Sequence, residues 1–101
     1  MMNKNMMKQA QQMQAKLMKA QEELESLTVE ASAGGGAVKV VATGKQTIES
    51  ITIDPGAVDP EDVELLQDMV LAAVNDALGK SQDLVQEKLG AITGGFKLPG
   101  M

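Results

Sequence analysis

A regular seven-residue spacing of apolar side chains runs through the first quarter of the chain. These side chains recur at alternating intervals of four and three positions, which places them on one narrow stripe of a helix; they are Met6, Ala10, Met13, Leu17, Ala20, Leu24 and Leu27. The residues between them are mostly Gln, Lys, Glu and Ala, which favour helix formation. We therefore predict one helix over residues 3–27, about 36 Å long at a rise of about 1.5 Å per residue. Because so thin a stripe cannot stabilise an isolated helix, we expect part of it to project beyond a small domain or to pair with another helix.

Helical spacing ends at Thr28 and gives way to alternation with a period of two. Three short alternating segments follow, at residues 28–33, 37–43 and 47–53, and glycine-containing turns separate them. Connections this short suit antiparallel hairpins and are too short for the crossover that parallel strands need. The pattern predicts a three-stranded antiparallel sheet.

A second helix is predicted over residues 60–92. Asp59 is expected to cap its N-terminus, with Pro60 at the first helical position. Gly79 interrupts the apolar stripe that follows and costs about 1 kcal/mol relative to Ala, so the sequence leaves open whether the helix bends there. The predicted fold class is therefore α+β, in the order α-β-β-β-α.

The length of 101 residues corresponds to one domain, which we assign to residues 1–93, with residues 94–101 as a flexible tail. Phe96 is the single aromatic residue, so aliphatic side chains and Met must supply the core, and a second copy of the chain would add burial. The longest apolar run, at residues 69–74, is far shorter than the roughly 20 residues that cross a membrane. The N-terminus also lacks the apolar stretch of a signal peptide, so we expect a cytoplasmic protein without membrane contact.

Missing residue types exclude most kinds of catalytic site. The chain has no Cys, His, Trp, Tyr or Arg, which excludes thiol chemistry, ordinary zinc sites and histidine bases. The glycines at 34–36 are not followed by the Lys-Ser/Thr of a phosphate-binding loop, so a hairpin turn is the better interpretation. The acidic residues between positions 54 and 64 could bind a hard cation, but they lack the spacing of a calcium loop, and helix capping already accounts for three of them. We predict no catalytic, cofactor-binding or metal-binding residues and no small-molecule substrate.

The net charge of −5 conceals a strong segregation along the chain. Residues 1–21 carry no carboxylate and four lysines, which are Lys4, Lys8, Lys16 and Lys19, whereas residues 54–76 carry seven carboxylates and no lysine. A locally positive surface can bind DNA phosphates even on an acidic protein. The same lysines could instead form a solvated helix face that maintains solubility, and composition alone favours that second interpretation.

Several runs of the sequence resemble one known family. Residues 8–24, KQAQQMQAKLMKAQEEL, are similar to the first helix of the YbaB/EbfC family of bacterial nucleoid-associated proteins. Residues 33–38 with Gly44 are similar to the strand–turn–strand of that family. Further similar runs lie at residues 59–62 and 71–77, in the second helix, and at residues 86–88, 93–95 and 98–100, at the C-terminal end.

The resemblance implies a homodimer of α/β subunits, sometimes described as tweezer-shaped, that binds DNA and contributes to nucleoid organisation and gene regulation without catalysis. It also implies a location in the cytoplasm at the nucleoid. Lys8, Lys16 and Lys19 match basic helix positions of the family, and Lys4 lies just before them. Position 79 is often basic in relatives, whereas here Gly79 precedes a lysine. Because the chain has no arginine, bidentate recognition of guanine is excluded, which favours contacts with the DNA backbone.

Two hypotheses follow. In the first, a non-enzymatic dimer contacts DNA phosphates through Lys4, Lys8, Lys16 and Lys19. In the second, the apolar stripe of residues 6–27 pairs with a partner helix, and the chain is a protein-interaction module. Under the first hypothesis, changing the lysines to Gln should weaken salt-sensitive DNA binding by similar amounts on all sequences. Under the second, changing Leu17 and Leu24 to Asn should abolish partner binding, while the lysine changes should matter little.

Overall fold

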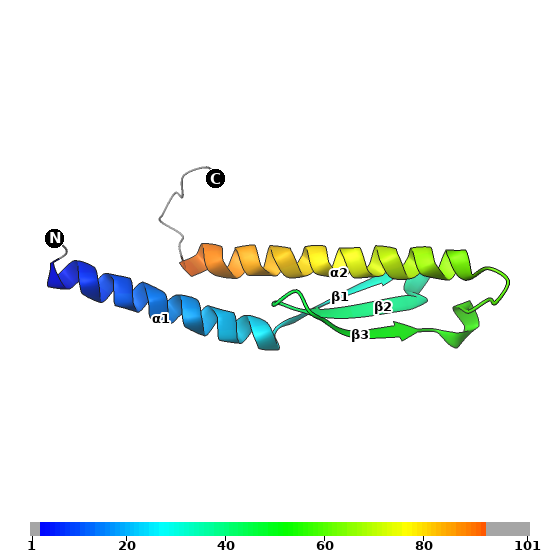
Figure 1. Cartoon of the computed structure of the whole chain (residues 1–101), viewed down its shortest axis with the longest axis horizontal. Helices are drawn as coiled ribbons and strands as arrows, with labels where there is room; N and C mark the ends of the chain where they lie inside the picture. The colour runs from blue at the N-terminus through cyan, green and yellow to red at the C-terminus, as the bar shows by residue number, and fades with distance from the viewer. Residues whose placement is uncertain (1–2, 93–101) are drawn as a thin grey trace.

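The computed structural model describes residues 3–92, so the predicted tail at residues 94–101 lies outside the described residues. The order of elements is helix, three strands and helix (Figure 1). They are α1 (Lys4–Ser26), β1 (Thr28–Ala33), β2 (Val38–Thr43), β3 (Ile48–Ile53) and α2 (Val63–Ile92). The α+β architecture predicted from the sequence is confirmed.

The three strands form one antiparallel sheet in the order β1-β2-β3. The turn between β1 and β2 is a short 3-10 segment, Gly34–Gly36, whose φ angles are 65°, 68° and 97°. Residues other than glycine are strained at such angles, which explains the three consecutive glycines. In the register, Ala31 lies opposite Val40, and Val40 lies opposite Ile51. These three side chains therefore project from the same face of the sheet.

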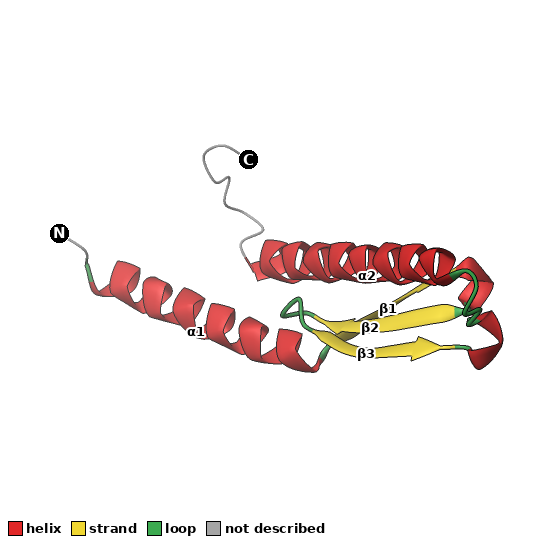
Figure 2. Ribbon diagram, turned by 45° about the vertical axis from the view of Figure 1, so that its right-hand side comes forward, coloured by secondary structure: helices red, strands yellow, loops and turns green. Residues whose placement is uncertain are grey.

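Helix α2 lies along that face and packs mainly on β1 and β2 (Figure 2). Ala73 and Ala77 are fully buried against the sheet, where Val38 and Val40 are also fully buried. Small side chains on α2 let the helix approach the strands closely, so the core of residues 3–92, which holds no aromatic side chain, packs closely on the sheet. On β3 the same face is only partly covered, and Ile51 remains 45% exposed.

Helix α2 begins later than predicted, because the cap is a different aspartate. Asp62 precedes the first helical residue, and its Oδ1 accepts a hydrogen bond from the N–H of Leu65 at 3.3 Å. Asp59 instead stabilises the turn before the helix, since its Oδ1 accepts from the N–H of Glu61 at 2.9 Å. The prediction that Asp59 caps the helix and that Pro60 opens it was therefore wrong. From Val63 onward α2 is one continuous helix that includes Gly79.

Helix α1 leaves the body of the molecule and extends well beyond the sheet (Figure 1). Only Ala20 and Leu24, both near its C-terminal end, are buried. The backbone N–H of Gly44, in the turn between β2 and β3, donates to the carbonyl oxygens of Leu24 and Leu27 at 2.9 and 3.0 Å. These contacts fix one end of α1 and leave the other end as an arm. The principal extents are accordingly 69 × 27 × 18 Å, and the radius of gyration is 19.3 Å, compared with about 13 Å for a compact chain of this length.

Candidate nucleic-acid interface

The four lysines predicted to bind DNA all lie on the projecting arm. Lys4, Lys8, Lys16 and Lys19 are exposed members of α1. At 3.6 residues per turn they fall within a sector of about 120° on the helix surface, and the distance from the first to the last along the axis is about 22 Å. The apolar stripe lies on another side of the helix, so the lysines can face a ligand while the stripe faces the body.

The arm begins in a way that suits a helix directed into solvent. Asn3 caps α1, and its Oδ1 accepts a hydrogen bond from the N–H of Met6 at 2.8 Å. The first turn contains no carboxylate. The positive end of the helix dipole therefore adds to the positive charge of Lys4 and Lys8 at the tip of the arm.

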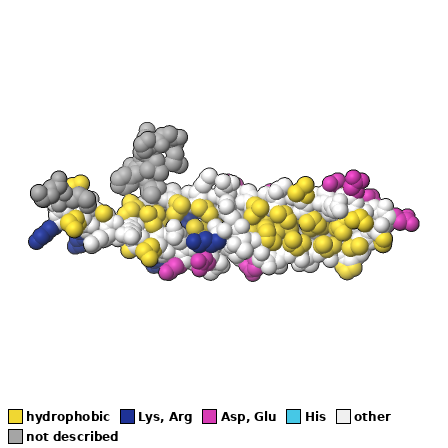
Figure 3. All heavy atoms as spheres, viewed as in Figure 1, with side chains coloured by type: hydrophobic (Ala, Val, Ile, Leu, Met, Phe, Trp, Pro, Cys, Tyr) yellow, Lys and Arg dark blue, Asp and Glu magenta, His cyan; other side chains and the backbone are white. Residues whose placement is uncertain are grey.

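Charges of opposite sign occupy opposite ends of the molecule. In the space-filling view, lysines mark the α1 end and carboxylates mark the end where β3 leads into α2 (Figure 3). Carboxylates repel anions and ammonium groups attract them, so the arm is the end of the molecule that favours an anionic ligand. The segregation seen in the sequence is thus a separation in space along the 69 Å length.

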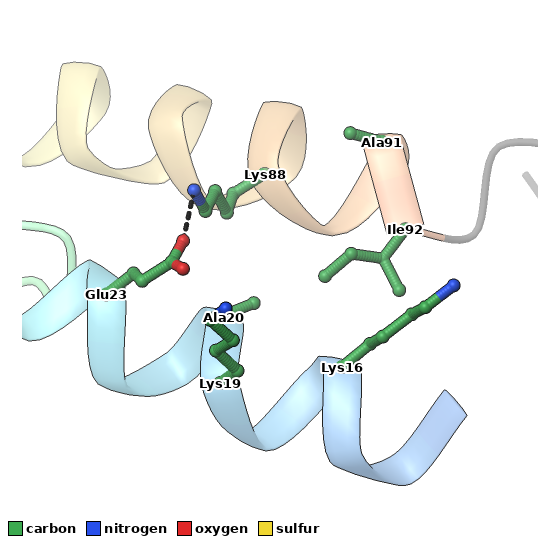
Figure 4. Close-up of a pocket in the computed structure, with 7 residues that line it drawn as sticks. All are labelled: Lys16, Lys19, Ala20, Glu23, Lys88, Ala91 and Ile92. Atoms are coloured by element: carbon green, nitrogen blue, oxygen red, sulfur yellow. Dashed lines mark ion pairs between the residues drawn. The ribbon is translucent and has the colours of Figure 1, made fainter. Parts of the chain in front are cut away.

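The base of the arm forms a groove with the C-terminal part of α2. The groove has a volume of about 260 Å³ and is lined by Lys16, Lys19, Ala20, Glu23, Lys88, Ala91 and Ile92. Figure 4 shows that the lysine and glutamate side chains come from facing helices and that the side chain of Ile92, at the end of α2, points toward α1. The groove therefore combines an apolar floor with three ammonium groups and one carboxylate.

One ion pair crosses this groove. The Nζ of Lys88 contacts the Oε2 of Glu23, and both side chains are partly exposed. The hydrogen bond from Lys88, reinforced by its positive charge, lowers the pKa of Glu23 below the ordinary value of 4.5. The carboxylate is therefore ionised near neutral pH and neutralises one lysine of the groove.

The structure brings only two of the predicted lysines into this groove. Lys16 and Lys19 line it, whereas Lys8 lies about two turns and Lys4 about three turns beyond Lys16 along the arm. Sequence reasoning missed Lys88, because it is separated from the first helix by the whole sheet. The sequence gives one indication of its position: Lys88 and Ile92 are four residues apart, so both lie on the same side of α2.

Two further observations concern other kinds of site. Within residues 3–92, no group of three or more carboxylates gathers where a metal ion could be held. Neither of the two described helices is both long enough and apolar enough to span a membrane.

Comparison with solved structures supports the fold. The chain superimposes on the crystal structure of the uncharacterized protein HP0035 from Helicobacter pylori with a TM-score of 0.73. The match covers 86% of this chain and 92% of that one, at 20% sequence identity. At this level of identity the likeness concerns the fold alone.

Comparison with sequences is more specific. A protein named "Nucleoid-associated protein" in Pelotomaculum thermopropionicum is 59% identical to this chain, over 95% of this chain and 91% of the relative. The protein of the same name in Desulforamulus reducens is 61% identical, over 99% of this chain and 94% of the relative. The protein of the same name in Moorella thermoacetica is 62% identical over 98% of this chain and 94% of the relative. The model of the YbaB/EbfC DNA-binding family matches residues 1–96. A family whose model spans nearly the whole chain, together with relatives of this identity, shows that the chain belongs to the YbaB/EbfC DNA-binding family.

Proposed function

We propose that this protein is a homodimer whose two α1 arms bind the DNA backbone through Lys4, Lys8, Lys16 and Lys19. In this role it contributes to nucleoid organisation and gene regulation in the bacterial cytoplasm and carries out no catalysis. The observation that supports this most directly is the charge of α1. The helix carries four exposed lysines, has no carboxylate in residues 4–21 and points away from the acidic end.

Contacts with phosphates rather than with bases follow from the side chains that are present. Lysine is a flexible point charge, and the bidentate pairing with guanine that arginine makes is absent from this chain. Each neutralised phosphate contributes about −0.9 to the slope of log affinity against log salt. Four contacts per arm therefore give a slope of about −3.6, and two arms give about −7.

The proposed dimer uses the apolar face that α2 leaves partly open. Ile51 is 45% exposed, while Ile48 and Ile53 on the same strand and Val70 and Val74 on α2 are only partly buried. Figure 3 shows apolar side chains gathered over this half of the molecule. A face of this kind on a small domain without aromatic residues suits a second copy, which would complete the core of both subunits.

The dimer is tested by placing a charge on that face. Ile51→Lys should reduce the particle mass in solution from twice 10.6 kDa to 10.6 kDa, because a lysine buried in an apolar interface lacks a partner. Ser50→Lys is the matched control, since Ser50 is exposed on the opposite face of the same strand. A monomeric mass for the unaltered protein would contradict the dimer, and equal masses for both variants would contradict this choice of face.

DNA binding is tested with the fourfold Lys→Gln variant at positions 4, 8, 16 and 19. Fluorescence anisotropy with a short duplex at several salt concentrations should give the steep slope for the unaltered protein and a slope shallower by about 3.6 per arm for the variant. Lys39→Gln with Lys45→Gln serves as the control, because both lysines are exposed outside α1. Equal affinity of the fourfold variant and the unaltered protein at matched salt would refute the assigned surface.

The protein-interaction hypothesis retains one supporting observation. Toward the tip of the arm the apolar stripe is unburied, and Met6 is 52% exposed. Under this hypothesis Met6→Asn with Met13→Asn abolishes binding to a partner helix and leaves DNA affinity intact. Leu24 is unsuitable for such a test, because it is buried in the chain's own core.

A further inference from the structure

The groove between α1 and α2 brings together charges that the sequence keeps far apart. Lys16 and Lys19 reach it from the arm, and Lys88 reaches it from the facing helix, and among the described residues Glu23 is the only lining carboxylate. The sum of these charges is +2. The volume of about 260 Å³ has room for several water molecules at about 30 Å³ each, and so for a small oxyanion such as a phosphate group.

We propose that this groove binds one phosphate of the DNA backbone through Lys16, Lys19 and Lys88, and that Glu23 competes with that phosphate for Lys88. The proposal rests on the DNA binding proposed above and extends it to a residue outside the arm. When no DNA is bound, the Glu23 carboxylate takes the place of the phosphate: it pairs with Lys88 and partly neutralises the positive charge of the groove.

The position of the groove relative to the arm supports a continuous path for the DNA backbone. At 3.6 residues per turn, Glu23 lies in the same sector of α1 as Lys16 and Lys19. A DNA strand that follows the exposed lysines from the tip of the arm therefore arrives at the groove, where Lys88 adds a contact from α2.

The ion pair is exchangeable because the arm does not depend on it. Leu24 and Ala20 are buried at 3% and 2% exposure, and the N–H of Gly44 holds two carbonyl oxygens at the end of α1. The side chains of Lys88 and Glu23 are 34% and 41% exposed, and ion pairs in such positions contribute little to stability. When a phosphate replaces the carboxylate, Lys88 therefore still has an anionic partner and the fold keeps its stability.

The competing explanation is that the ion pair is a strut that positions the arm. The two explanations predict opposite effects of Glu23→Gln on DNA affinity. A competitor weakens binding, so its removal strengthens binding, whereas removal of a strut weakens it.

The test measures affinity for a short duplex by anisotropy with the full chain and its Glu23→Gln variant. We expect a gain of about twofold to fivefold at low salt, in line with the size of exposed charge interactions. Glu22→Gln is the matched control, because it removes the same charge one residue away and Glu22 does not line the groove. In a second background that carries Lys88→Gln, the advantage of Glu23→Gln over Glu22→Gln should vanish.

The possible outcomes separate this proposal from the proposed function. Suppose that the unaltered protein binds the duplex. If the affinity gain of Glu23→Gln is then no larger than that of Glu22→Gln, or if Glu23→Gln binds more weakly than the unaltered protein, the groove proposal is overturned and DNA binding stands. A gain that persists unchanged with Lys88→Gln also overturns it. Absence of binding by the unaltered protein overturns both. Urea unfolding of each variant confirms that the fold is intact.

Discussion

Replacing Gly44 with Ala should detach the arm from the body of the protein. A Cβ atom at Gly44 would lie 2.6 Å from the carbonyl oxygen of Leu24 and 2.8 and 2.9 Å from two of its side-chain carbons. Carbon atoms in favourable contact are about 3.5–4.0 Å apart. Leu24 is almost completely buried, so its side chain has little room to move, and the end of α1 must shift instead.

The expected loss of stability is about 3 kcal/mol. Overpacking a well-packed site costs about 1–3 kcal/mol. The shift also weakens the hydrogen bonds from the N–H of Gly44 to the carbonyl oxygens of Leu24 and Leu27, now 2.9 and 3.0 Å long, each worth about 1 kcal/mol net. Since only Ala20 and Leu24 of α1 are buried, much of this loss should appear as local opening of the arm rather than as global unfolding.

Urea unfolding monitored by circular dichroism gives the global loss, and hydrogen exchange of the α1 amides gives the local one. The matched control is Gly79→Ala, because that glycine is exposed, lies inside α2 and has open space where a Cβ would be added. This control should stabilise the protein by about 1 kcal/mol. A Gly44→Ala variant with the unfolding midpoint and α1 exchange rates of the unaltered protein would refute the assigned role of this turn.

Three further predictions test individual contacts. Asp62→Ala should lower the free energy of unfolding by about 1 kcal/mol, because the α2 cap is lost. Urea titrations should show a smaller loss for Asp59→Ala, and a larger loss for Asp59→Ala than for Asp62→Ala would contradict the observed start of α2. Ser81→Ala should cost about 1 kcal/mol, because the buried Oγ of Ser81 donates to the carbonyl oxygen at the end of β2 at 2.6 Å; an unchanged urea midpoint would argue against that bond. Because the folded pKa of Glu23 is lowered, its pairing with Lys88 persists above pH 4.5 and is lost as the pH falls through that lowered value. A carboxyl titration followed by NMR should therefore show a midpoint below 4.5 that rises in Lys88→Gln, and an equal midpoint in both proteins would contradict the ion pair.

Local spacing was sufficient to predict the elements but not which parts of them are buried. The seven-residue stripe of α1 identified a helix, because a period of 3.5 is visible in the sequence without any tertiary contact. The same stripe gives no indication that Ala20 and Leu24 are buried while Met6 is exposed. That difference depends on where the turn at Gly44 meets the helix, which is a contact across about 20 residues of sequence.

The start of α2 shows a second limit. Asp59 and Asp62 both precede apolar periodicity, and Pro60 is well suited to a first helical turn. The prediction placed the cap at Asp59, with Pro60 at the first helical position. The turn from Asp59 to Asp62 lies between β3 and α2 and directs the chain into the helix that packs on the sheet. In this turn the N–H of Asp62 donates to the carbonyl oxygen of Asp59 at 2.9 Å. Two capping residues three positions apart cannot be ranked without knowledge of the direction that the chain must take.

The assignment of the α1 lysines to DNA is a prediction from the segregation of charge along the sequence, whereas the groove depends on two helices meeting. This distinction also determines which experiments can separate binding from folding. Lys4, Lys8, Lys16 and Lys19 are exposed on α1, and substitutions at such positions usually change stability by less than about 0.5 kcal/mol. Changes in DNA affinity at these positions therefore report directly on phosphate contacts. At Gly44 no charge changes, so a loss of affinity greater than the loss that unfolding accounts for comes from the position of the arm. If Gly44→Ala weakens DNA binding while the salt slope stays constant, the lysines still meet phosphates once bound, and the loss measures the free energy of placing the arm.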